Sequence, residues 1–170
     1  MANASSEHRQ SYLPHVAPLS RLQDNTFANA ESFEAREVPQ AWRTAGGGSL
    51  SIATAHYKHG LHSLQWDWQV GSRLIITNPY LLKEAGESKL GGMKIWIYSE
   101  KALDDRLVIR IGSAADMEAR DPRYMFTVGV NFTGWRCVWV RFRHDAANPS
   151  YKGDAAQPLE VVEIAAPTQA

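Results

Sequence analysis

The stretch NFTGWRCVWVRFRHD, residues 131–145, places two tryptophans, three arginines and the only cysteine of the chain within fifteen residues. Side chains of a β-strand point alternately to its two faces, so this segment separates into two sets. One face carries Val138, Val140 and Phe142, and we interpret it as core. The opposite face resembles core at one end and a surface for an acidic or sugar-like partner at the other; it carries Trp135, Cys137, Trp139, Arg141 and Arg143.

The composition predicts one globular domain. The chain has 170 residues, of which 44% are hydrophobic, enough to bury a core without disulfides. We therefore expect Cys137 to be a small buried hydrophobe. The formal net charge is zero, which argues against nucleic acid as a partner, so an anion must be recognised by a local patch. No apolar run approaches the about 20 residues of a membrane span, and no membrane partner is expected.

Turn signals divide the chain into short segments with strand character. Residues 1–29 lack a sustained period and are expected to be an irregular arm, followed by a β-sandwich domain over 30–170. Strands are expected near 31–36, 49–56, 63–69, 73–78, 92–100, 106–113, 124–131, 135–144 and 159–165. Short strands without a long amphipathic helix favour an all-β, antiparallel sandwich.

In two of the expected strands, the alternation of side chains predicts which way the tryptophan rings point. Trp66 and Trp68 alternate in step with Leu64, so we expect both rings in the core. In the segment 92–100 both faces carry apolar bulk, with Trp96 on the face opposite the aliphatic residues. This pattern predicts a central strand whose outer face is covered or used.

Motifs for catalysis and metal binding are missing from the sequence. His56, His59 and His62 are spaced by three, but Gly60 predicts a turn among them, so we expect solvated or locally hydrogen-bonded rings. The sequence contains no HExxH motif, no Cys/His zinc pattern and no phosphate-binding glycine loop. We predict no catalytic residue and no required cofactor.

A binding surface is predicted if the strands at 92–100, 106–113 and 135–144 are neighbours in one sheet. Aromatic rings offer a flat apolar surface to a pyranose ring, and arginine forks match carboxylate or sulfate bidentately. The composition therefore suits an acidic polysaccharide, and the candidate residues are Lys94, Trp96, Tyr98, Arg106, Arg110, Trp139, Arg141 and Arg143. The same residues also suit a second core layer or a docking surface for a neighbouring domain, with tryptophans as buried anchors.

Three blocks of the sequence resemble a known family. HYKHGLHSLQWDWQVGSRLIITNPYL, GGMKIWIYSEKALDDRLVIRIG and FTVGVNFTGWRCVWVRFRHD are similar to the N-terminal domain of the chondroitin sulfate ABC lyases and related hyaluronate/chondroitin lyases. The similarity covers about 31–165, and its most specific parts are 60–68 and 131–138. The resemblance implies a jelly-roll β-sandwich like those of carbohydrate-binding modules, placed ahead of a helical toroid domain.

The resemblance also implies a function. The family cleaves chondroitin sulfate or hyaluronan by β-elimination at a uronic acid, and its catalytic residues belong to later domains, so none is carried over to this sequence. We therefore expect a non-catalytic accessory module of a secreted or periplasmic bacterial glycosaminoglycan lyase, partnered by the downstream catalytic domain of the same chain. The alternative is a stand-alone carbohydrate-binding or domain-docking module without a lyase partner.

The resemblance implies two further expectations about the domain. Sandwich modules of this kind often hold a structural Ca²⁺, and Glu34 is the nearest candidate for its first ligand. The final residues EIAAPTQA stop where one more strand is expected to close the sandwich. We therefore expect a fragment with an unpaired sheet edge and an incomplete calcium site.

Overall fold

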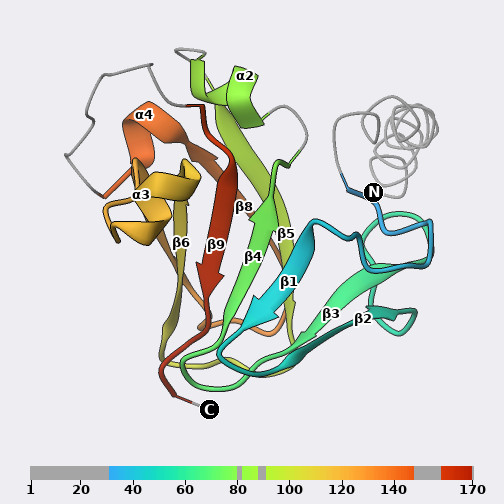
Figure 1. The fold of residues 1–170 in the computed structure, drawn as a ribbon. Helices are drawn as coiled ribbons and strands as arrows, with labels where there is room; N and C mark the ends of the chain where they lie inside the picture. The colour runs from blue at the N-terminus through green and yellow to red at the C-terminus, as the bar shows by residue number, and fades with distance from the viewer. Residues whose placement is uncertain (1–30, 80–81, 88–90, 148–157, 170) are drawn as a thin grey trace, which may run out of the picture. The chain divides into compact units, whose positions relative to one another are not determined.

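The computed structural model describes residues 31–79, 82–87, 91–147 and 158–169 (Figure 1). The fold described below is that of the unit Phe33–Ala170. The predicted arm over 1–29 lies outside the described residues. No helix in the described part of the chain is long and apolar enough to cross a membrane.

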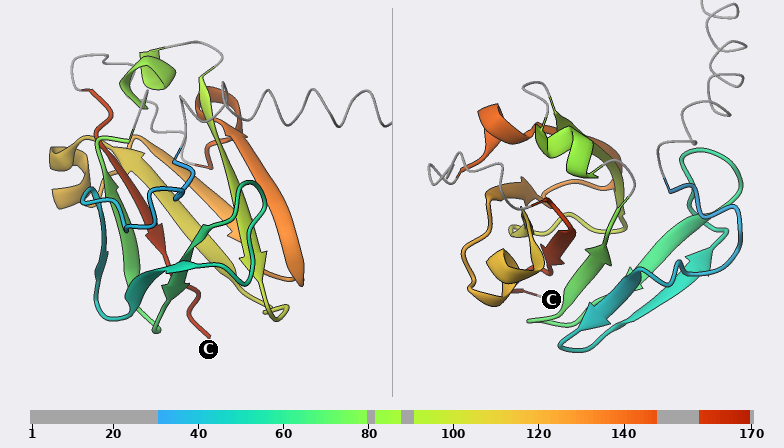
Figure 2. Two further views of the ribbon diagram at one scale, coloured as in Figure 1. Left: turned by 90° about the vertical axis from the view of Figure 1, so that its right-hand side faces the viewer. Right: turned by 45° about the horizontal axis from the view of Figure 1, so that its top comes forward.

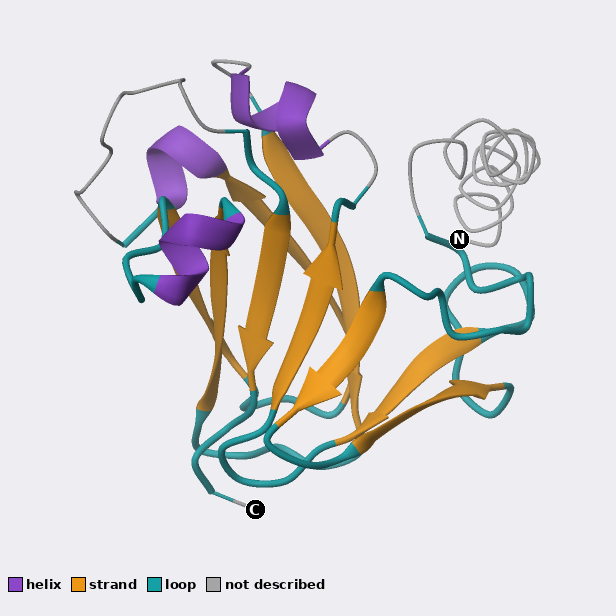
Figure 3. Ribbon diagram, viewed as in Figure 1, coloured by secondary structure: helices purple, strands orange, loops and turns teal. Residues whose placement is uncertain are grey.

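The described residues form strands with a few short helices between them. The strands are β1 (Trp42–Ala45), β2 (Ser49–Ala53), β3 (Ser63–Asp67), β4 (Arg73–Thr77), β5 (Gly92–Ser99), β6 (Arg106–Gly112), β7 (Tyr124–Gly129), β8 (Gly134–Arg141) and β9 (Val161–Ala165). The helices are α2 (Leu82–Glu87), α3 (Ala114–Glu118) and α4 (Phe142–Asp145), which gather toward one end of the strands (Figure 3).

All strand pairs are antiparallel. One sheet has five strands in the order β1-β4-β9-β6-β7, and two further pairs are β2-β3 and β5-β8. The five-stranded sheet and the β5-β8 pair form two layers (Figure 2). The predicted all-β antiparallel sandwich is confirmed, while its jelly-roll connectivity stays a prediction.

The core fills the space between these layers. Each strand of the five-stranded sheet turns its alternate apolar side chains inward, and Ile109 and Ile111 of β6 are fully buried. From the opposite layer, β8 contributes Val138 and Val140 to the same cluster, as the opening alternation predicts. Phe142 follows them and stacks on Tyr124, with ring centroids 5.3 Å apart. Burying one such side chain contributes about 1.5–3 kcal/mol to folding.

The strand expected at 31–36 is absent, and the one expected at 135–144 is too long. Residues 31–36 form a turn, because Phe33 and Arg36 have φ angles of 63° and 61° that no strand accommodates. The 135–144 strand ends at Arg141, where the Asp145 carboxylate accepts the backbone N–H of Arg141 at 2.8 Å. Arg143 therefore lies on α4 and not on the strand.

Two other expectations concern burial and sheet edges. Cys137 is exposed, so its prediction as a buried hydrophobe is wrong; the outward face of β8 carries it. Strand β9 lies in the middle of the five-stranded sheet, between β4 and β6, and the edge strands are β1 and β7. The expected additional closing strand, and with it the boundary of the domain, stays a prediction.

Candidate functional site

Strands β5 and β8 bring four of the eight predicted binding residues onto one surface. Their register places Lys94 opposite Trp139, and Tyr98 opposite Trp135. The intervening pair is Trp96 and Cys137. Met93, Ile95 and Ile97 point the other way and pack against the core. We call this surface the aromatic face; it consists of Lys94, Trp96, Tyr98, Trp135, Cys137 and Trp139.

The third strand of the predicted surface lies elsewhere. Strand β6 pairs with β7 and β9 in the five-stranded sheet, so the expectation that it neighbours β5 and β8 is wrong. Arg106 and Arg110 are therefore separated from the aromatic face. The period of two in a sequence fixes which side chains share a face of one strand, but not which strands pair.

Residues 54–62, the loop between β2 and β3, cover part of the aromatic face. His56 stacks on Tyr98 with ring centroids 4.0 Å apart and an interplanar angle of 14°. His59 meets Trp96 edge-on at 6.3 Å, and the Lys58 ammonium lies 4.6 Å from the Trp96 ring centroid. Trp96 and Tyr98 therefore already have partners within the fold.

The loop side chains were missed as site residues because their contact is tertiary. The sequence shows only histidines spaced by three around a glycine, and this pattern is also typical of solvated loops. Burial lowers the pKa of His59, and the nearby charges of Lys58 and Lys94 lower it further. These effects disfavour a positive charge on the His59 ring.

Trp139 is the part of the aromatic face that stays open. Its side chain is 71% exposed, whereas the other ring-bearing residues of the face are half-buried. Lys94 lies directly across the strand pair and is also exposed. Trp135 packs edge-on against Tyr98 at 5.3 Å and lies at the opposite end of the face.

Two predicted arginines, one at the end of β8 and one on α4, already make contacts within the protein. The Arg141 guanidinium donates to both carboxylate oxygens of Asp145, at 2.9 and 3.2 Å. These bonds lower the pKa of Asp145 to about 2 and raise that of Arg141. Arg143 donates from Nη2 to the carbonyl of Glu87 at 3.4 Å. Both arginines are exposed; Arg141 follows Trp139 on the outward face of β8 and borders the aromatic face, whereas Arg143 contacts α2.

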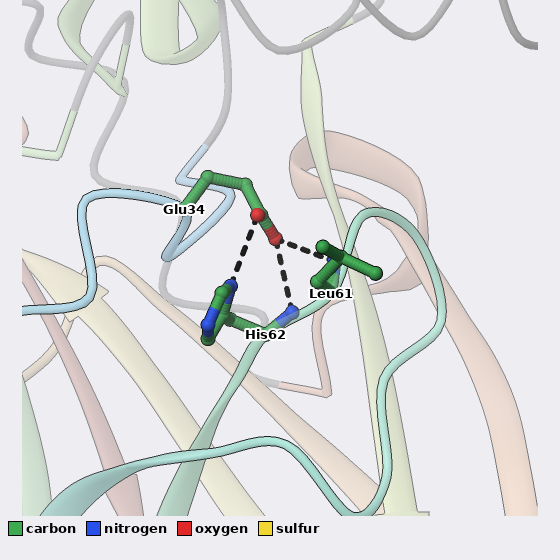
Figure 4. A network of polar contacts seen from close by, with 3 residues as sticks. All are labelled: Glu34, Leu61 and His62. Carbon is green, nitrogen blue, oxygen red and sulfur yellow. Dashed lines mark hydrogen bonds and ion pairs between the residues drawn. The ribbon is translucent and has the colours of Figure 1, made fainter.

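Glu34 anchors the covering loop (Figure 4). One carboxylate oxygen accepts the backbone N–H groups of Leu61 and His62 at 2.8 and 3.0 Å, and the other lies 3.0 Å from Nδ1 of His62. The bond from the His62 side chain is the largest of the effects that lower the pKa of Glu34. Gly60 has a φ of 67°, and a Cβ there would overlap the Glu34 carboxylate.

The surroundings of Glu34 do not form a calcium site by themselves. Both carboxylate oxygens are occupied by N–H donors, and a calcium ion takes six to eight oxygen ligands. Among the residues that the structure describes, no group of three or more His, Cys, Asp or Glu side chains could hold a metal. Calcium binding through Glu34 stays a prediction.

The arrangement is suited to binding. A pyranose ring could lie against the exposed indole of Trp139, with its acidic substituent beside the Lys94 ammonium. The ammonium of Lys94 lies 5.8 Å from the Trp96 ring centroid, so the half-buried ring orients this charge on the surface.

Comparison with known proteins gives matches along most of the chain. The family model described as "Lyase, N terminal" matches residues 28–170. A chondroitin sulfate ABC exolyase of Bacteroides thetaiotaomicron is 30% identical over 143 residues, which cover 80% of this chain and 13% of that protein. The chondroitin sulfate ABC exolyase of Proteus vulgaris is 30% identical over 154 residues, covering 89% and 14%.

A third match is shorter. The chondroitin sulfate ABC endolyase of Proteus vulgaris is 33% identical over 106 residues, which cover 58% of this chain and 10% of the endolyase. The chain thus spans about one seventh of the length of the two exolyases that it matches.

Proposed function

Because the chain belongs to the family of N-terminal lyase domains, we propose that it is a non-catalytic accessory module of a glycosaminoglycan lyase. Its proposed ligand is an acidic polysaccharide, chondroitin sulfate or hyaluronan, which it holds for a catalytic domain elsewhere in the same protein. The relatives are named for chondroitin sulfate, which supports this ligand class. A polymer substrate of this kind lies outside the cell, so the proposed location is secreted or periplasmic.

The observation that carries the proposal is the exposure of Trp139 beside Lys94. Trp139 is 71% exposed, the most exposed large hydrophobic side chain in the described part of the chain, and it lies on one face with three other aromatic rings. A contiguous surface of this kind is typical of a binding site. The 54–62 loop contacts the rings of Trp96 and Tyr98, and Trp135 packs against Tyr98, which leaves the Trp139 indole as the platform. Sugar rings bury apolar C–H groups against such a platform.

The cation beside the platform explains the preference for an acidic sugar. Lys94 is exposed and two residues from Trp96, and no carboxylate pairs with its ammonium among the described residues. An exposed charge pair of this type contributes at most about 1 kcal/mol and is screened by salt. Binding is therefore expected to favour chondroitin sulfate over neutral glucans and to weaken as ionic strength rises.

The test is a titration of the 170-residue chain with chondroitin sulfate at low salt, followed by calorimetry and tryptophan fluorescence. Truncation of a central aromatic anchor costs more than about 1 kcal/mol, so Trp139→Ala should weaken binding about fivefold or more. Val70→Ala removes apolar surface from another exposed position and serves as the control. Equal affinity of Trp139→Ala and wild type would remove Trp139 from the proposal.

A second candidate function is domain docking. The anchor residue of a protein interface is often a tryptophan surrounded by contacts that contribute little binding energy. Trp139 is exposed, so it could bind a neighbouring domain as well as a sugar. The titration separates the two functions. If wild type fails to bind chondroitin sulfate even at low salt, the docking function is the better explanation of the aromatic face.

A further inference from the structure

We propose that the outer face of the five-stranded sheet is a second binding surface for a sulfated, uronate-bearing polysaccharide. The inference rests on the proposed function for its ligand class, but its residues and its sheet are separate from the aromatic face. Two of its residues, Arg106 and Arg110, were predicted to bind an acidic sugar as part of a different surface. The structure places them among other arginines instead.

The outward positions of this sheet have an unusual charge distribution. The inward positions hold the core, so the alternate positions of each strand face outward. Among all outward positions of these five fully described strands, the charged residues are Arg43, Arg73, Arg106, Arg110 and Glu163. We call this surface the arginine face.

Three of these residues lie in one row across the sheet. In the register, Arg43 of β1 is opposite Ile75 of β4, which is opposite Glu163 of β9, which is opposite Arg110 of β6. The four strands lie side by side in this order (Figure 1). With about 4.8 Å between strands, the backbones at Arg43 and Arg110 are about 14 Å apart. The row is long enough to meet successive charged groups of a polymer.

The single acid of the face is already neutralised. Glu163 is 8% exposed and accepts from Nη1 of Arg110 at 2.8 Å and from Nη1 of Arg73 at 3.1 Å. A guanidinium has five N–H donors, so each of these arginines retains donors after this contact. The face carries four arginines against one glutamate, and the chain as a whole has no net charge. Positive charge is therefore concentrated here.

The two arginines that do not contact Glu163 are free to bind a ligand. Arg43 and Arg106 are exposed, and their guanidinium groups make no hydrogen bond or ion pair among the described residues. The neighbouring acid, Asp105, is engaged by the backbone N–H groups of Arg106, Thr168 and Gln169 and by the Thr168 hydroxyl. At the other end of β6, the acid Asp116 of α3 also has a partner, because its Oδ2 lies 3.7 Å from Nη2 of Arg123.

The chemistry of the face favours a sulfated polysaccharide over an acidic protein. All four cations are arginines, whose planar forks bind sulfate and carboxylate bidentately, while lysine would act only as a point charge. The positions between them are small or apolar and provide no donors for a protein backbone; they include Ala45, Ile75, Val108, Val161 and Ala165. A polymer with repeating sulfate and carboxylate groups matches this spacing of charge.

The test compares Arg43→Ala/Arg106→Ala with wild type in the same 170-residue chain. These two arginines support no contact, so the melting temperature should be unchanged. Removing two exposed charge contacts should weaken binding of chondroitin sulfate about fivefold at low salt and flatten its salt dependence. Lys83→Ala/Lys101→Ala removes the same charge from exposed positions elsewhere and should bind as wild type does. Arg43→Lys/Arg106→Lys should be intermediate, because it keeps the charge and loses the fork.

The outcomes separate this inference from the proposed function. In a Trp139→Ala background the arginine substitutions should weaken the remaining binding by the same factor, because effects at distant independent sites add. If the Arg43→Ala/Arg106→Ala variant binds chondroitin sulfate as tightly as the lysine control while Trp139→Ala still weakens binding, the arginine face is refuted and the proposed function stands. Tighter binding of polyglutamate than of chondroitin sulfate through Arg43 and Arg106 would refute the polysaccharide assignment. Absence of any binding by wild type would overturn both.

Discussion

At the scale of single residues, Trp66 combines a favourable and an unfavourable contribution to stability. Its ring packs against the core from β3, which confirms the predicted inward phase, whereas Trp68 lies half-buried beyond the end of the strand. The indole Nε1 of Trp66 is buried without a hydrogen-bond partner among the described residues. An unsatisfied buried donor costs about 1–3 kcal/mol, so the ring stabilises the fold in spite of its N–H group.

Substitutions at Trp66 should separate these two contributions. Trp66→Phe removes the N–H and keeps most of the apolar ring, so we expect a free energy of unfolding equal to or above that of wild type. Trp66→Ala leaves a cavity and should lower it by about 3–5 kcal/mol. Urea denaturation of the two variants measures both changes. A loss of similar size in Phe and Ala variants would mean that Nε1 has a partner in solution.

Glu34 should make the anchoring of the 54–62 loop sensitive to acid. Its pKa is lowered in the folded state, so its stabilising contribution is complete above the ordinary value of 4.5 and is lost as the pH falls through the folded value. The difference in melting temperature between wild type and Glu34→Gln should therefore be constant near neutral pH and shrink below about pH 4.5. Melting curves from pH 7 to pH 3 test this, and a difference independent of pH would contradict it.

At the scale of elements, sequence periodicity predicted which face of a strand a side chain occupies, but it did not predict which strands are neighbours. Val138 and Val140 are buried and Trp139 is open, as the alternation in 131–145 indicates. The condition that the strands at 92–100, 106–113 and 135–144 are neighbours holds for β5 and β8 but not for β6, because strand order depends on long-range packing that a local pattern does not encode. The 31–36 error has a local cause, since two non-glycine residues there adopt left-handed backbone angles. The covering loop was missed because ring stacking between distant segments has no sequence signature.

The junction of β8 and α4 offers a prediction at this scale. Asp145 holds the Arg141 guanidinium at the margin of the aromatic face. In Asp145→Asn the carboxylate is lost, so Arg141 is freed and one negative charge disappears. We expect tighter binding of chondroitin sulfate at low salt, with a small loss of thermal stability, measured by titration and by melting curves. Unchanged affinity would place the ligand away from this end of β8.

At the scale of the whole molecule, binding and chemistry should be separable. The proposed function assigns the elimination reaction to other domains, so the purified 170-residue chain should not produce unsaturated uronate from chondroitin sulfate or hyaluronan. The ultraviolet absorbance of the unsaturated product measures this, with a heat-denatured sample as the control. Product formation above that control would show that the chain carries catalytic residues of its own.

The exposed thiol of Cys137 has a practical consequence. It is the only cysteine of the chain, it lies opposite Trp96 in the strand pair, and it is two residues from Trp139. A maleimide reagent can therefore modify the protein at a single point in the middle of the aromatic face. A polysaccharide resting on Trp139 should shield this thiol and slow its alkylation, so the labelling rate becomes a footprint of occupancy. Under oxidising conditions the same thiol could join two copies of the chain through their aromatic faces, which a reducing agent would reverse.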